Sequence, residues 1–157
     1  MLPVKLAVVA VGRLKEKFWR EAEEEYRKRI LPHASLFVEE VAEEADAGDV
    51  SRILATEGGR IAARLRERDY VVALDAGGRR FSSPAFAAKL ADVAGFGHGR
   101  IVFIIGGSRG LAEDILKRAN LRLSFSDFTF PHQMMRIILL EQVYRAFSIM
   151  AGAKYHK

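Results

Sequence analysis

Ile101-Val102-Phe103-Ile104-Ile105-Gly106-Gly107-Ser108-Arg109-Gly110 is the stretch that decides the fold, because five apolar residues run directly into a loop with three glycines. A short apolar run that ends at glycine is typical of a strand buried on both faces. Residues 111–119 then have helical spacing. A buried strand that leads through a glycine turn into a helix predicts a parallel α/β sheet.

The same unit recurs along the chain. Apolar runs predict strands near 4–11, 36–41, 70–74, 101–105 and 121–125, and helical patterns cover 16–30, 50–66, 111–119, 134–150 and a segment opened by Ser83-Pro84. We expect the third strand to end at Asp75, with a turn at Gly77-Gly78. The alternation predicts one α/β domain over residues 1–157, with a mostly parallel five- or six-stranded sheet and helices on both faces.

Composition excludes several classes of protein. Half of the 157 residues are hydrophobic and 29% are charged, which is a globular balance. The absence of cysteine excludes disulfides and thiolate metal sites, and the four histidines have no metal-ligand spacing, so we expect no metal. We find no apolar run long enough for a bilayer and no signal peptide, and we expect a cytoplasmic protein without membrane contact.

Charge is distributed unevenly. Residues 1–78 hold 13 Lys/Arg and 15 Asp/Glu, a net charge of −2, whereas residues 79–157 hold 12 and 5, a net charge of +7. A basic half indicates either a polyanionic partner or a solubilising surface, and composition does not separate the two. The helix expected at 134–150 is apolar around well over one face. This favours packing against a second copy across a two-fold axis, and burial within a monomer is the alternative.

Three loops are candidates for chemistry, because parallel sheets bind ligands beyond the carboxyl ends of their strands. They are the loop after Leu74, the glycine loop that starts at Gly106, and the aromatic loop from Phe125 to His132. The glycine loop alone is equally compatible with a tight turn. The aromatic loop predicts either a slot for a flat base or a loop tucked under the last helix.

With these residues in place, the chain resembles a known family. The matching segments are Val9-Ala10-Val11-Gly12-Arg13-Leu14-Lys15, Leu74-Asp75 with Gly78 and Ser82-Ser83, Ile104-Ile105-Gly106-Gly107 with Gly110-Leu111, Thr129-Phe130-Pro131-His132-Gln133 with Arg136, Leu140-Glu141-Gln142-Val143-Tyr144-Arg145-Ala146, and Tyr155-His156-Lys157. They keep their order over essentially the whole chain. The sequence resembles the ribosomal RNA large subunit methyltransferase H (RlmH) family of SPOUT-class methyltransferases.

That resemblance implies a C-terminal trefoil knot, a homodimer, and S-adenosyl-L-methionine (SAM) as methyl donor. The implied reaction is methylation of N3 of a pseudouridine in 23S rRNA of the assembled ribosome. By position, the donor would touch Leu74, Gly106, Phe125, Ser126, Asp127, Phe128, Thr129 and Phe130. Asp127 departs from the family pattern, in which a basic or small residue often stands there, so the role of its side chain is left open.

The terminal tripeptide completes the expected site. A chain end is ordinarily frayed, but Gly152 is placed to end the last helix and turn the tail back. The imidazole of His156 is then a candidate to accept the N3 proton or to orient the base, and Tyr155 is a candidate to stack on the base or to hydrogen-bond it. His132, Arg136, Arg145 and Lys157 are candidates to contact the RNA. A nucleotide-binding oxidoreductase and a non-catalytic RNA-binding module remain the alternative functions.

Overall fold

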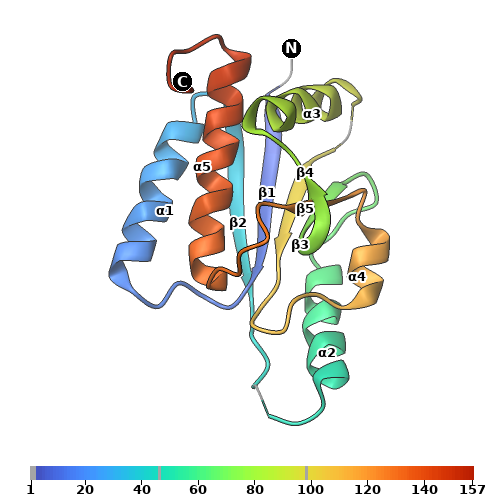
Figure 1. Cartoon of the computed structure of the whole chain (residues 1–157). Coiled ribbons are helices and arrows are strands. Elements are labelled where there is room, and N and C mark those ends of the chain that lie inside the picture. The colour runs from blue at the N-terminus through green and yellow to red at the C-terminus, as the bar shows by residue number, and fades with distance from the viewer. Residues whose placement is uncertain (1–2, 46, 98) are drawn as a thin grey trace.

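The computed structural model describes residues 3–45, 47–97 and 99–157 and shows one five-stranded sheet between two layers of helices (Figure 1). In chain order the elements are β1 (Val4–Val11), α1 (Lys17–Ile30), β2 (Ala34–Val41), α2 (Val50–Ala62), β3 (Tyr70–Arg80), α3 (Ser83–Gly95), β4 (Ile101–Ile105), α4 (Glu113–Arg118), β5 (Leu121–Ser124) and α5 (His132–Met150). All the strand pairs are parallel, in the spatial order β2-β1-β4-β3-β5. The predicted α/β class and parallel sheet are therefore confirmed.

The side-chain alternation along β1 and β4 explains the two layers. Leu6 and Phe103 face a core shared with α1, α3 and α5, whereas Val9 and Ile104 face a smaller core beneath α2 and α4. β4 is buried along its whole length because helices cover both of its faces. These five apolar residues therefore decide the fold, as the sequence indicates.

The third strand differs from its prediction. β3 does not end at Leu74 but continues to Arg80, and its pairing with β5 is interrupted by a bulge between Leu74 and Arg79. A Cβ on Gly78 would lie 2.7 Å from the carbonyl oxygen of Arg122 on β5. Gly78 therefore permits a close approach of two backbones, and the predicted turn at Gly77-Gly78 is wrong.

Several element ends also differ from the prediction. α2 and α4 are shorter than expected, α5 begins at His132, and β5 ends at Ser124, so that Phe125 belongs to the following loop. The differences in element bounds lie at helix and strand ends, where periodicity carries little information. In α2 the amphipathic pattern predicts that the polar side chains are exposed, but Glu57 is buried.

A buried ion pair holds the amino ends of β3 and β4 together. The Arg100 guanidinium donates to both carboxylate oxygens of Asp69, at 2.9 Å each, and to the Arg64 carbonyl oxygen. Burial alone would raise the pKa of the Asp69 carboxyl, but hydrogen bonds from Arg100 and from the Arg66 backbone N–H outweigh it, and the pKa is lowered. This pair anchors the edge of the sheet opposite the strands' carboxyl ends.

α5 lies between α1 and α3 and covers the larger core (Figure 1). Leu139, Leu140 and Val143 are fully buried against the sheet. Burial within the chain thus accounts for much of the apolar surface of α5, but Met134 and Ile138 stay partly exposed. A dimer remains a prediction that rests on this outer face.

Candidate functional site

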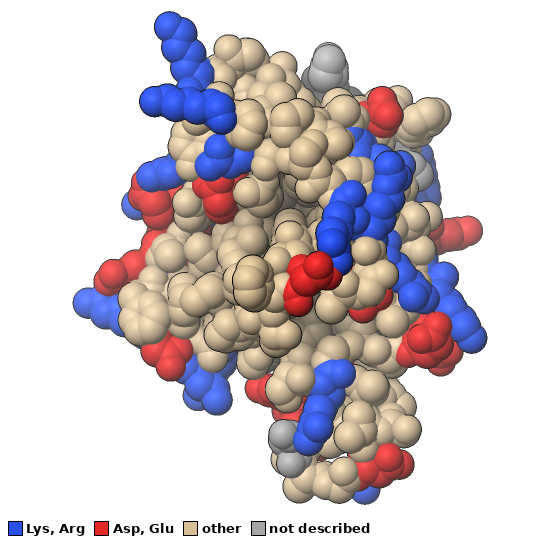
Figure 2. Space-filling model, viewed as in Figure 1, with Lys and Arg blue, Asp and Glu red and all other residues tan. Residues whose placement is uncertain are grey.

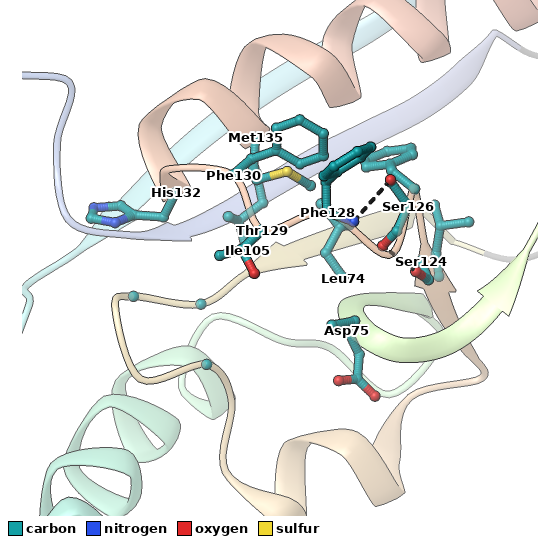
Figure 3. A pocket seen from close by; sticks show the side chains of 16 residues that line it. Leu74, Asp75, Ile105, Ser124, Ser126, Phe128, Thr129, Phe130, His132 and Met135 are labelled. Atoms are coloured by element: carbon teal, nitrogen blue, oxygen red, sulfur yellow. Dashed lines mark hydrogen bonds between the residues drawn. The ribbon is translucent and has the colours of Figure 1, made fainter.

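A cavity of about 180 Å³ opens at the carboxyl ends of β3, β4 and β5. All three loops expected from the sequence contribute to it, so the edge of the sheet gathers them as a parallel arrangement predicts (Figure 3). Its lining is mostly apolar with a few hydroxyl groups: Leu74, Asp75, Ala76, Ile105, Gly106, Gly107, Gly110, Leu123, Ser124, Phe125, Ser126, Phe128, Thr129, Phe130, His132 and Met135.

The glycine loop forms a tight turn at one wall of the cavity. The Gly110 backbone N–H donates to the Gly107 carbonyl oxygen at 3.1 Å, and Gly110 has a φ of +86°, which favours glycine. A Cβ on Gly106 would lie 2.5 Å from the Gly110 carbonyl oxygen. Gly106 is therefore required by the turn itself as well as by its place beside the cavity.

The aromatic loop forms the opposite wall. Its backbone is held by the Ser126 hydroxyl, which accepts from the Phe128 N–H at 3.0 Å, and by the Ser124 hydroxyl, which donates to the Ser126 carbonyl oxygen at 3.2 Å. Phe128 is 80% exposed at the mouth, and Phe130 lies beside it (Figure 3). Phe125 packs against the larger core beneath α5, but the exposure of Phe128 shows that the loop is not tucked under the helix as a whole, and the arrangement fits a slot for a flat, partly apolar group.

Asp127 is the predicted donor contact that does not line the cavity. Its carboxylate forms an ion pair with Arg80 at the end of β3. Both side chains are more than half exposed, so the pair contributes little to stability. The ion pair connects the end of β3 with the aromatic loop on the outside of the cavity.

Basic side chains border the cavity. Figure 2 shows Lys and Arg side chains gathered over the region of β3 and β5, where Arg79 and Arg80 are exposed and Arg122 is partly exposed. The Arg122 guanidinium reaches Glu113 at 3.4 Å and Asp75 at 3.9 Å. The second half of the sequence carries the net positive charge, and part of that charge lies beside the mouth of the cavity (Figure 2).

Two predicted RNA contacts lie elsewhere. Arg136 is only 3% exposed, and its guanidinium donates to Glu40 at 2.6 Å, to Glu23 at 3.2 Å and to the Gly12 carbonyl oxygen at 3.2 Å. In this structure it connects α5 with α1, β2 and the end of β1. Arg145 is at the other end of α5, beside the C-terminal tail.

The tail folds back on α5. Gly152, with a φ of +70°, ends the helix, and the Ala153 N–H donates to the Ser148 carbonyl oxygen at 2.9 Å, as in a Schellman motif. The Tyr155 hydroxyl donates to Glu141 at 2.7 Å, and Arg145 contacts His156 Nδ1 at 3.1 Å. The turn expected at Gly152 is thus present, and the frayed alternative does not describe this tail.

Tyr155 is held as a neutral phenol. Its hydrogen bond to the Glu141 carboxylate, with burial and the charge of Glu141, raises the pKa of Tyr155 to about 12. The ring also packs edge-on to Tyr144, with centroids 4.8 Å apart, and under the Arg145 guanidinium at 4.7 Å. A phenol with this pKa serves as a hydrogen-bond donor or a stacking surface at neutral pH, not as a base.

The tail and the cavity lie at opposite ends of α5. His132 begins the 19-residue helix at the cavity, and Met150 ends it. The tail docks on Glu141 and Arg145, so at 1.5 Å per residue its contacts begin nine residues, or roughly 14 Å, along the helix from His132. Within one chain the structure therefore brings together the three loops and His132, but not Tyr155, His156 or Lys157.

Sequence reasoning missed several lining residues. Met135 follows His132 by three positions, so helical spacing could have placed it at the cavity. Asp75 belongs to the loop expected after Leu74, whereas nothing in the sequence singles out Ala76, and the bulge between Leu74 and Arg79 has no local sequence signal. Among the described residues, no helix is long and apolar enough to span a membrane, and no group of three or more His, Asp or Glu side chains is placed to hold a metal ion.

The fold is an α/β sheet with helices on both faces, and its cavity lies at the carboxyl edge of the parallel strands. Residues 4–156 match the family described as "Predicted SPOUT methyltransferase". The match covers almost the whole chain, so the protein belongs to the SPOUT methyltransferase family. This agrees with the class that the sequence resemblance indicates.

Two solved structures share the fold at low sequence identity. One is a candidate methyltransferase from Legionella pneumophila in complex with bound SAM, with a TM-score of 0.50, 11% identity, and coverage of 92% of this chain and 67% of that chain. The other is a candidate methylase family protein from Haemophilus influenzae Rd KW20, with a TM-score of 0.51, 13% identity, and coverage of 98% and 70%. At these identities the likeness concerns the fold alone.

Proposed function

We propose that this protein transfers a methyl group from SAM to N3 of a pseudouridine in 23S rRNA, acting on the assembled ribosome. The observation that carries the proposal is the cavity, in which the loops after Leu74, at Gly106 and from Phe125 meet at one edge of the sheet. The SPOUT family supplies the class of reaction. The resemblance to the RlmH family supplies the nucleotide.

The cavity residues fit an adenosine group. Leu74, Ile105 and Phe130 offer apolar surface for a flat ring, while the narrow glycine turn leaves room for a close backbone approach. When bound, SAM supplies a methyl group on a positively charged sulfur. The protein's main task is then to hold the acceptor base in line with that methyl group.

The reaction also requires a proton acceptor. The N3 lone pair forms the new N–C bond, the C–S bond breaks with its electron pair going to sulfur, and the N3 proton goes to a base. We assign this base to His156 and the orientation of the target base to Tyr155. The neutral phenol of Tyr155 fits stacking or hydrogen-bond donation and does not fit proton removal.

The separation of tail and cavity implies a homodimer. Since the tail docks on Glu141 and Arg145, roughly 14 Å or more of helix from His132, the tail of one subunit would act at the cavity of the other. The partly exposed residues Met134 and Ile138 on α5 are the proposed contact. The trefoil knot belongs to the same proposal, and the loops of residues 106–112 and 125–131 would form it.

Basic side chains would hold the RNA phosphates. Lys157 is exposed and Arg145 is partly exposed at the tail, and Arg79 and Arg80 border the cavity. His132 lines the cavity and is proposed to contact the target base. Arg136 is proposed to support the RNA site indirectly, because its guanidinium is buried and paired with two glutamates.

Two measurements test the proposed function. Calorimetry should show binding of SAM and none of NAD, which separates a methyltransferase from an oxidoreductase. Ribosomes from cells that lack the protein should then accept one labelled methyl group when the purified protein and SAM are added. SAM binding without methyl transfer to any RNA would reject the substrate, and failure to bind SAM would leave only an RNA-binding module.

A further inference from the structure

Acidic side chains flank the two glycines at the carboxyl ends of β1 and β4. A Cβ on Gly107 would lie 3.5 Å from both Glu43 Oε1 and Glu57 Oε1. A Cβ on Gly12 would lie 3.3 Å from Glu43 Oε2 and 3.7 Å from His132 Nε2. Two carboxylates and an imidazole therefore meet above these glycines, and we call this group of five residues the acidic notch.

Glu57 is the unusual member of the acidic notch. It is only 4% exposed, and its Oε2 accepts from the Glu44 backbone N–H at 3.0 Å. Its Oε1 is buried without a hydrogen-bond partner among the described residues. Burying an unpaired carboxylate oxygen costs free energy, and the exposed carboxylate of Glu43 beside it adds a like charge. A cation bound nearby would offset the like charges and part of the cost of burying the Glu57 carboxylate.

The acidic notch adjoins the cavity proposed for the donor. His132 and Gly107 belong to both. At about 180 Å³, the cavity is smaller than the ~300–1,000 Å³ that usually encloses a drug-sized ligand, so it has room for only part of SAM. Glu43 also lines a hollow of about 330 Å³, to which Arg13 and Lys15 contribute positive charge and to which Glu40, paired with Arg136, contributes a carboxylate.

We propose that the acidic notch binds the α-ammonium group of the donor's amino-acid half. This inference rests on the proposed function. Glu43 would contact the ammonium group, and Glu57, behind Gly107, would act as a positioning residue that adds negative charge without touching the ligand. The donor's carboxylate would then face Lys15 and Arg13 in the neighbouring hollow, while the adenosine half stays in the cavity.

Two ligands isolate this part of the donor. S-adenosylhomocysteine and 5′-methylthioadenosine share the adenosine group and the thioether, but only the first has the ammonium and carboxylate groups. Calorimetry on the whole protein measures the ratio of their affinities. Glu43→Gln should weaken S-adenosylhomocysteine about tenfold, the effect of a lost charge-assisted hydrogen bond, and leave 5′-methylthioadenosine unchanged.

Glu57→Gln should lower the same ratio by a smaller factor, and the double variant should approach the ratio expected from adenosine contacts alone. Glu44→Gln is the matched control, because Glu44 is close in sequence but pairs with Arg60 at 2.9 Å, and both affinities should stay unchanged. Thermal melts establish folding. If Glu57→Gln does not fold, the exposed Glu43→Gln variant decides the question alone.

Equal weakening of both ligands would overturn the inference, because the acidic notch would then only shape the cavity. An unchanged ratio in Glu43→Gln would also overturn it. A wild-type protein that binds neither ligand would instead reject the proposed function, and this inference with it. The two failures are distinguishable because 5′-methylthioadenosine reports on the adenosine site by itself.

Discussion

The cavity and the C-terminal tail are built in opposite ways, although the sequence marks both as functional. The cavity is assembled from three loops that lie far apart in the sequence and meet at one edge of the sheet. The tail is a local structure, in which Tyr155 and His156 fold back on Glu141 and Arg145 of the preceding helix. Each is well defined, but α5 keeps them at opposite ends of one subunit.

This difference indicates that donor binding and methyl transfer depend on different parts of the protein. The cavity needs no second chain to gather its residues, so donor binding is expected to be a property of one subunit. The tail has its side chains arranged but does not line this cavity, so methyl transfer is expected to need a partner. The following predictions test this division, from the largest expected effect to the smallest.

Removal of residues 155–157 should separate the two regions most clearly. We expect folding and donor affinity to stay nearly intact while methyl transfer falls by a factor of about 10² or more, the usual loss with a general base. His156→Ala should show the same loss. Labelled-methyl transfer to ribosomes measures the rate, and a truncated protein with the normal rate would remove the tail from the active site.

The dimer should appear as twice the chain mass in ultracentrifugation at micromolar concentration. Mixing then provides a sharper test of shared sites. At SAM concentrations well below the weakened affinity, subunits with Gly106→Ala and subunits without the tail should each have little activity alone, yet a mixed dimer pairs an intact cavity with an intact tail and should regain part of the activity. A clean monomer, or no recovery on mixing, would contradict a site shared between subunits.

RNA affinity should depend steeply on salt concentration if the basic residues 79–157 bind RNA phosphates. With three neutralised phosphates, the affinity should fall by a few tens of fold between 50 and 200 mM salt, and log K should be linear in log salt. Arg80→Gln should make the slope of log K against log salt shallower by about 1, the contribution of one phosphate contact. A flat response in filter binding would mean that the charge at the cavity only serves solubility.

Gly106→Ala should weaken SAM about tenfold or more, because its Cβ would meet the Gly110 carbonyl oxygen at 2.5 Å and displace the turn at the cavity wall. Gly59→Ala is the control. Its Cβ meets nothing within 4 Å and it lies in helix α2, so stability should rise by up to ~1 kcal/mol with donor affinity unchanged. Calorimetry and thermal melts separate these outcomes, and unchanged SAM affinity in Gly106→Ala would contradict the placement.

The smallest effect concerns the ionisation of Tyr155. Its pKa is raised from the ordinary value of 10.0 to about 12, so the neutral phenol stabilises the folded tail below pH 10. That contribution is lost as pH rises from 10 to about 12. Ultraviolet titration should show late ionisation of Tyr155 as well as of Tyr26, whose pKa burial also raises, and the Tyr155 contribution should be missing in Tyr155→Phe. A normal ionisation near 10 would mean that the tail is not docked on Glu141.

Prediction from the sequence succeeded where the signal is local. The apolar run of β4 and the glycines after it fix a buried strand, and the shared edge of a parallel sheet then implies that the loops after β3, β4 and β5 meet. Of the donor contacts predicted by position, only Asp127 lies outside the cavity lining, and its partner Arg80 stands 47 residues away in the sequence.

Only the tertiary structure decided the features that depend on distant partners. The extension of β3 follows from the close approach of Gly78 to β5, and the burial of Arg136 follows from Glu23 and Glu40, which lie 113 and 96 residues away. The sequence by itself determined the fold class and the loops of the site, because side-chain periodicity reports burial one element at a time. It did not determine the acidic notch or the distance between cavity and tail, because these arise from contacts between elements that no local pattern encodes.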